Sequence, residues 1–132
     1  MLGFSNRWYP SAGKTAVWLT IGNELDDRIR VVDAPHFVAT KLTAFRGRGA
    51  GDFYHHDMED FIAVVDGRAE LLDEVKSGRD DVREFVATEI TTLMNDESFV
   101  EAIPGHLPGD KASQARLPLV QLRLRSIAAL KV

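Results

Sequence analysis

Residues 41–60 read KLTAFRGRGAGDFYHHDMED, and this stretch decides how the helical part of the chain folds. A helix-like run with three cationic side chains stops at the glycine-rich turn GRGAG (47–51), and an acidic helix opens beyond it. Because the turn is too short to let the two halves part, we expect two helices of opposite charge to lie side by side. Such a pair can bind a phosphate-bearing substrate, or it can form an internal salt bridge.

The hydrophobic pattern extends this helical organisation in both directions. Asp33 can cap a first helix, and Pro35 suits its first turn. A second helix is expected from about His56 to Asp66, with Gly67 as its stop. Further helices are expected over residues 69–76, 79–94 and 111–130, with a turn or two over 96–103, and Pro118 either kinks the last helix or marks its true start.

The first 33 residues have a different character. Residues 14–21 and 28–33 favour β-structure, with a turn between them. A lone hairpin is marginal in water, so it should pack on the helices or extend a larger sheet. We predict an α+β fold that is mostly helical, with an N-terminal β-hairpin packed on a bundle of about five or six helices. The 132 residues are expected to form a single domain, in which an aromatic arm and hairpin (1–33) precede a helical region (34–132).

Composition excludes several classes of protein. The chain has no cysteine, so neither disulfides nor thiolate zinc sites can stabilise it. No run approaches the roughly 18 apolar residues of a membrane span, and the first residues do not resemble a secretion signal. We therefore expect a cytoplasmic protein without a membrane partner.

The charge of the chain is unevenly distributed. Its net charge of −4 argues against non-specific nucleic-acid binding as the main activity. Residues 1–50 carry a balance of +3, residues 51–101 of −11 and residues 102–132 of +4. This pattern indicates internal charge complementarity or a focused basic pocket. In the last helix, Arg116, Arg123 and Arg125 could face the acidic middle of the chain.

The cationic residues of the opening stretch allow two interpretations. On an ideal helix Lys41 and Arg48 share a face, and Arg46 lies about 140° round from Lys41. A lysine point charge and an arginine fork could together hold the phosphates of a nucleotide. The alternative is an amphipathic helix whose polar face happens to be basic.

The acidic residues after the turn also allow more than one interpretation. Asp57 and Asp60 lie three residues apart, hence on one helical face. A carboxylate there could orient Lys41, act as general base for an attacking hydroxyl, or only stabilise the start of the helix through its dipole. A further alternative is a metal-dependent phosphohydrolase that binds a divalent ion through His55, His56, Asp57 and Asp60, with additional ligands from His36, Asp96 or Asp110.

Residues 34–75, which read APHFVATKLTAFRGRGAGDFYHHDMEDFIAVVDGRAELLDEV, resemble the second half of AbiEii-type nucleotidyltransferases. These form the toxin class of the polymerase-β-like superfamily. The resemblance extends to LGFSNRWYP (2–10) and to PGHLPGDKASQARLP (104–118), so it covers nearly the whole chain.

The resemblance implies specific roles. In that family a lysine followed by one or two arginines on a helix contacts the nucleotide, which corresponds here to Lys41, Arg46 and Arg48. A downstream DxxD pair completes the site and corresponds to Asp57 and Asp60. Lys41, Asp57 and Asp60 are therefore the expected catalytic residues. Mg²⁺ and a nucleoside triphosphate are the expected cofactors of the complete family enzyme, and no metal ligand is assigned to this chain.

The chain also departs from the family. A Gly-Ser motif with paired acids, which holds Mg²⁺ and the triphosphate in the family, does not precede Lys41. We therefore expect the nucleotide- and acceptor-binding C-terminal part of a toxin-like nucleotidyltransferase that transfers NMP, with little or no activity alone. Its expected partners are a nucleotide and either an antitoxin or the missing N-terminal half. The alternative is a non-enzymatic module that forms a homodimer through the aromatic arm around Phe4, Trp8 and Tyr9.

Overall fold

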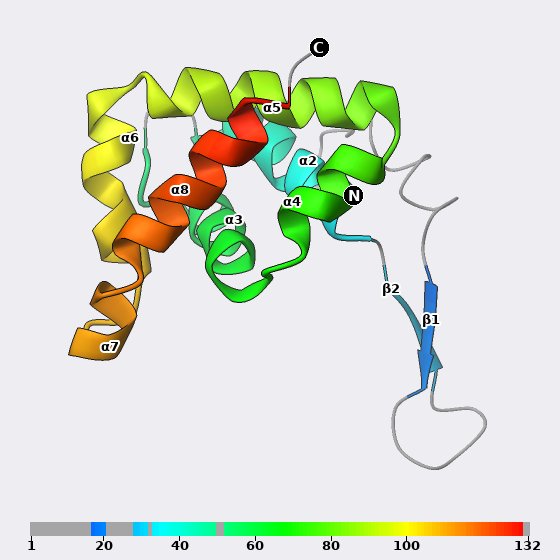
Figure 1. The fold of residues 1–132 in the computed structure, drawn as a ribbon, viewed down its shortest axis with the longest axis horizontal. Helices are drawn as coiled ribbons and strands as arrows, with labels where there is room; N and C mark the ends of the chain where they lie inside the picture. The colour runs from blue at the N-terminus through cyan, green and yellow to red at the C-terminus, as the bar shows by residue number, and fades with distance from the viewer. Residues whose placement is uncertain (1–16, 21–27, 32, 50–51, 131–132) are drawn as a thin grey trace.

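A computed structural model describes the backbone of residues 17–20, 28–31, 33–49 and 52–130 (Figure 1). It confirms that the chain is mostly helical. The helix α5 runs along one side of the molecule, and α8 crosses it diagonally (Figure 1). The helical elements are α2 (Ala34–Ala44), α3 (His56–Gly67), α4 (Leu71–Ser77), α5 (Asp80–Met94), α6 (Glu97–Ala102), α7 (Lys111–Gln114) and α8 (Leu117–Ala128), with a π-helical turn η1 (Phe45–Gly49) and a 3-10 turn η2 (Ile103–His106).

The helix boundaries follow from local chemistry. The side chain of Asp33 accepts a hydrogen bond from the backbone N–H of His36 at 2.9 Å and so caps α2. Pro35 occupies the first turn, where its missing N–H costs nothing. Pro118 lies in the first turn of α8, and α7 is a separate short helix. Of the two alternatives for Pro118, the structure therefore supports a true helix start.

One hydrophobic cluster joins the helices from α2 to α8. Its largest fully buried side chains come from each helix from α2 to α6, from the turn η2 and from α8. Helices α2 and α3 contact each other, and both contribute side chains to this cluster. The buried members include Val38, Met58, Phe61, Ile62, Val65, Val86, Ile90, Phe99, Ile103, Val120, Leu124 and Ile127.

The N-terminal strands do not support one part of the predicted fold. Strands β1 (Val17–Thr20) and β2 (Arg28–Val31) pair antiparallel, with Val17 opposite Val31. They extend away from the helices instead of packing on them (Figure 1). The aromatic arm falls in residues 1–16, outside the described residues.

Arg116, the N-cap residue of α8, and Arg123 within α8 contact the C-terminal end of α3. The sequence predicted that both could face the acidic middle of the chain. The guanidinium of Arg116 donates two hydrogen bonds to the carboxylate of Asp66, at 2.8 and 2.9 Å. Arg123 donates to the backbone carbonyls of Val65 and Asp66 at 3.0 and 2.7 Å. Both contacts place positive charge at the C-terminal end of α3, where the helix dipole favours it. The hydrogen bonds from Arg116 hold the pKa of Asp66 below its usual value, and the charges of both arginines add to this against the effect of burial.

We expect Asp66→Asn to lower the free energy of unfolding by about 1 kcal/mol at neutral pH, because it removes a charged hydrogen-bond acceptor. The pKa of Asp66 is lower in the folded state than in the unfolded state. Its ionised carboxylate therefore stabilises the fold fully above the unfolded-state pKa of about 3.9, and this stabilisation is lost as the pH falls through the folded-state pKa. Urea unfolding of both proteins at neutral pH and near pH 3 should therefore show the difference shrinking in acid. Asp80→Asn, at a side chain that is 89% exposed, is the control with a small effect at both pH values. A difference for Asp66→Asn that does not change with pH would contradict the assignment.

Candidate functional site

The candidate site is centred on the side chain of Lys41, in the last turn of α2. Its Nζ lies 2.7 Å from Oδ2 of Asp60 and 3.6 Å from Oδ1 of Asp57. The two aspartates lie three residues apart near the start of α3, so both face α2. The helices of opposite charge thus meet through a salt bridge, one of the two arrangements that the sequence allowed.

The three charged groups differ strongly in burial. The side chain of Asp57 is 1% exposed, that of Lys41 23% and that of Asp60 44%. A carboxylate as buried as Asp57 requires positive charge or hydrogen-bond donors close by, because burial disfavours its ionised form. Asp60 reaches solvent, where its attraction to Lys41 is screened. Asp57 is therefore the structural partner of Lys41, and Asp60 is the partner that an anionic ligand could displace.

An aromatic ring also supports the ammonium group of Lys41. The centroid of the Phe37 ring, one turn earlier in α2, lies 5.5 Å from Nζ. At this distance the ring attracts the cation through its π-electrons. The ammonium contacts a ring on its own helix and two carboxylates on the next, and the Lys41 side chain is partly exposed.

Arg46 does not join Lys41 in the structure. Its Nη1 lies 2.7 Å from Oε1 of Glu89 on α5, with the Arg46 side chain 66% exposed and that of Glu89 13% exposed. The prediction placed Arg46 on a regular α-helix, whereas the residue lies in the π-helical turn η1, which changes the direction of the side chains that follow α2. In this structure Arg46 is therefore paired with α5, and the phosphate clamp stays a prediction. The side chain of its third member, Arg48, lies outside the described residues.

An open pocket lies beside Arg46. Its volume of about 570 Å³ is in the range of small-ligand sites. Its wall is mostly apolar, and its polar groups include the Arg46–Glu89 pair. Neither the pocket nor the role of Glu89 was predicted, because nothing near Glu89 in the sequence distinguishes it from other acids of α5. The pocket is lined by Leu42, Phe45, Arg46, Phe53, Glu89, Thr92, Leu93, Asp96 and Ser98.

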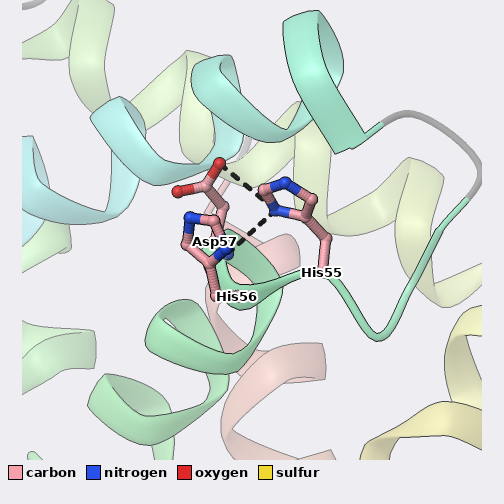
Figure 2. A group of neighbouring side chains, drawn as sticks. All are labelled: His55, His56 and Asp57. Carbon is pink, nitrogen blue, oxygen red and sulfur yellow. Dashed lines mark hydrogen bonds and ion pairs between the residues drawn. The ribbon is translucent and has the colours of Figure 1, made fainter.

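Two histidines stand at the start of α3, next to Asp57 (Figure 2). Nδ1 of His55 accepts a hydrogen bond from the backbone N–H of Asp57 at 3.1 Å, so the imidazole caps the helix. The same nitrogen lies 3.4 Å from Oδ2 of Asp57. The ring of His56 stacks on that of His55, with the centroids 4.2 Å apart.

The other residues considered as metal ligands have different roles. Nδ1 of His36 lies 2.7 Å from Oδ1 of Asp33 at the start of α2. The side chain of Asp96 accepts from a backbone N–H at the start of α6, and that of Asp110 does so at the start of α7. Each of the three serves the start of a different helix. The structure thus gives the phosphohydrolase interpretation no support beyond the group at His55–Asp57.

The longest described helix, α5, has 15 residues, and no helix among the described residues combines the length and apolar character needed to cross a bilayer. Comparisons of the chain with protein-family models, with curated proteins and with solved structures found no match.

Proposed function

We propose that this chain is the nucleotide- and acceptor-binding part of a toxin-like nucleotidyltransferase, in which Lys41 contacts the phosphates of a nucleoside triphosphate. The observation that most supports the proposal is the position of the Lys41 ammonium between α2 and α3. Carboxylates hold it in place, and the Lys41 side chain as a whole is 23% exposed. A buried structural ion pair would not need an accessible cation, whereas a phosphate ligand would.

The two aspartates take different roles in this proposal. Asp57 is almost fully buried and keeps Lys41 in position through one carboxylate oxygen. Asp60 is 44% exposed and contacts the same ammonium at 2.7 Å. A phosphate that binds Lys41 displaces Asp60, because that contact faces solvent and is weak. The released carboxylate of Asp60 is then available to accept a proton from the hydroxyl of an acceptor.

Arg46 can contribute to the same ligand after a small rearrangement. Its pair with Glu89 joins an Arg46 side chain that is 66% exposed to a Glu89 side chain that is 13% exposed, so solvent screens the arginine side of the pair. A triphosphate bound at Lys41 offers the guanidinium a stronger, bidentate partner. We therefore propose that Arg46 moves from Glu89 to the phosphates when a nucleotide binds.

The residues around Lys41 do not fit the Mg²⁺ ion that the family resemblance implies. Mg²⁺ requires carboxylate oxygens that are available for octahedral coordination. Oδ1 of Asp57 and Oδ2 of Asp60 contact the ammonium of Lys41, which leaves too few carboxylate oxygens beside it for octahedral coordination. We therefore assign no metal-dependent step to these residues.

The proposal predicts saturable binding of nucleoside triphosphates, measured by calorimetry with each of the four common nucleotides. The double variant Lys41→Met/Asp57→Asn, which removes the cation together with its buried partner, should weaken binding about 10- to 100-fold. This corresponds to the loss of a charge-assisted hydrogen bond of roughly 1.5–3 kcal/mol. Arg46→Gln should weaken binding less, about 3- to 10-fold.

A variant that removes a competing anion provides the opposite test. Asp60→Asn should strengthen binding about 2- to 5-fold, because the carboxylate no longer competes with phosphate for Lys41. Arg79→Gln, which changes an exposed cation paired with Asp81, should leave binding unchanged. The proposal fails if no nucleotide binds saturably below about 1 mM, or if the double variant binds as tightly as the wild type.

A further inference from the structure

The start of α3 brings together three groups with the chemistry of transition-metal ligands. His55, His56 and Asp57 each present a nitrogen or carboxylate oxygen, and these atoms lie within 4.8 Å of one another. Figure 2 shows the two rings and the carboxylate gathered at the first turn of the helix. The three residues differ in burial, from the exposed ring of His56 to the buried carboxylate of Asp57.

The residue that caps α3 contributes an unprotonated imidazole nitrogen to this group. Histidine is not among the residues preferred as helix N-caps, which are Ser, Thr, Asp and Asn. Nδ1 of His55 nevertheless accepts the backbone N–H of Asp57 at 3.1 Å. A nitrogen that accepts a hydrogen bond carries no proton, so the neutral ring bears its proton on Nε2. The single lone pair of this tautomer lies on Nδ1, so a metal ion bound there takes the place of the backbone N–H of Asp57.

The carboxylate of Asp57 approaches the same nitrogen at a separation typical of ligands on one ion. Oδ2 lies 3.4 Å from Nδ1 of His55. Two atoms bound to one tetrahedral ion at about 2.0–2.1 Å are roughly 3.3 Å apart. The other oxygen, Oδ1, faces Lys41, so one carboxylate can serve both contacts.

His56 supplies the third ligand after a side-chain rotation. Its ring stacks on that of His55 with an interplanar angle of 28°. The lone pairs of two nearly parallel rings do not meet at one point, so His56 must turn before both imidazoles can bind one ion. Its exposure leaves room for this rotation.

We propose that His55, His56 and Asp57 bind one divalent transition-metal ion of the zinc class. Two imidazoles and one carboxylate suit Zn²⁺, Co²⁺ or Ni²⁺, whereas Mg²⁺ and Ca²⁺ prefer sites made of oxygen ligands. Solvent or a substrate atom fills the fourth position. The bound ion draws on the same carboxylate that contacts Lys41, which links metal occupancy to the position of that lysine. The metal site does not depend on the proposed nucleotide binding.

Calorimetry with Zn²⁺ alone, on the full chain, tests this site. We expect one ion per chain, and Co²⁺ should show the visible absorption of a four-coordinate site. His56→Ala, at an exposed position where folding is not at risk, should weaken Zn²⁺ binding at least about 10-fold. Asp57→Asn should abolish binding, and excess Mg²⁺ should not compete.

The control is His106→Gln, which removes an imidazole outside the group, on η2, while the new amide can still donate to the backbone carbonyl of Phe53. This variant should bind Zn²⁺ as the wild type does. The proposal is overturned if the wild type binds no stoichiometric Zn²⁺, or if His56→Ala binds Zn²⁺ with unchanged affinity. If His56→Ala and His106→Gln lose the same amount of Zn²⁺ affinity, the proposal is likewise overturned, because the ion would then bind to imidazoles non-specifically.

Discussion

Lys41→Met should destabilise the protein by about 2–3 kcal/mol, much more than the loss of an ordinary surface cation. The variant keeps most of the apolar stem of the side chain but removes an ammonium that lies 3.6 Å from the carboxylate of Asp57. Because that carboxylate is only 1% exposed, water cannot replace the lost charge. Urea unfolding at neutral pH, followed by circular dichroism, measures the change in the free energy of unfolding.

A second substitution identifies the cause of this loss. Lys41→Met/Asp57→Asn should recover at least half of the lost stability, since a neutral amide is much easier to bury than a carboxylate. The matched control is Arg79→Met, which breaks an exposed pair with Asp81 and should cost less than about 0.5 kcal/mol. If Lys41→Met costs no more than this control, other groups compensate the charge of Asp57 and the lysine is not a structural partner.

Most of the helical fold was predictable because its determinants are local. Asp33 and Pro35 mark the start of α2, and Gly67 marks the end of α3, through backbone rules that act within a few residues. The contact of Lys41 with Asp57 and Asp60 was also predictable. Two helices joined by a short turn must lie together, and residues three apart must share a face.

The remaining features depend on the tertiary structure. The pairing of Arg46 with Glu89 depends on the π-helical turn after α2, which no simple sequence rule predicts. The cap formed by His55 was missed because histidine rarely takes that role. The packing of the hairpin on the helices was predicted from the need to bury its side chains, but the structure does not support that contact.

Phe99→Ala is expected to have the largest effect on stability, a loss of about 3–4 kcal/mol. The Phe99 side chain is fully buried, and its ring lies edge-on to Phe53 with the centroids 5.8 Å apart. Phe53 in turn stacks on Phe45 at 5.7 Å. The variant therefore leaves a cavity and removes the contact between the Phe99 and Phe53 rings. Thermal and urea unfolding measure the loss, and Leu122→Ala, at a side chain that is 54% exposed, should cost less than about 0.5 kcal/mol.

The same substitution tests whether the aromatic row positions the charged site. Phe53 lies two residues before His55, and its ring contacts Phe45 and Phe99. These contacts anchor the segment that leads into α3 and the aspartates of that helix. With that anchor weakened, the start of α3 should open more often than the rest of the helix, because local opening follows local contacts. Hydrogen exchange should then be faster at the backbone amides of residues 57–60, beyond the increase that the lower global stability explains. A uniform increase along α3 would instead show that Phe99 stabilises the core without positioning the residues that contact Lys41.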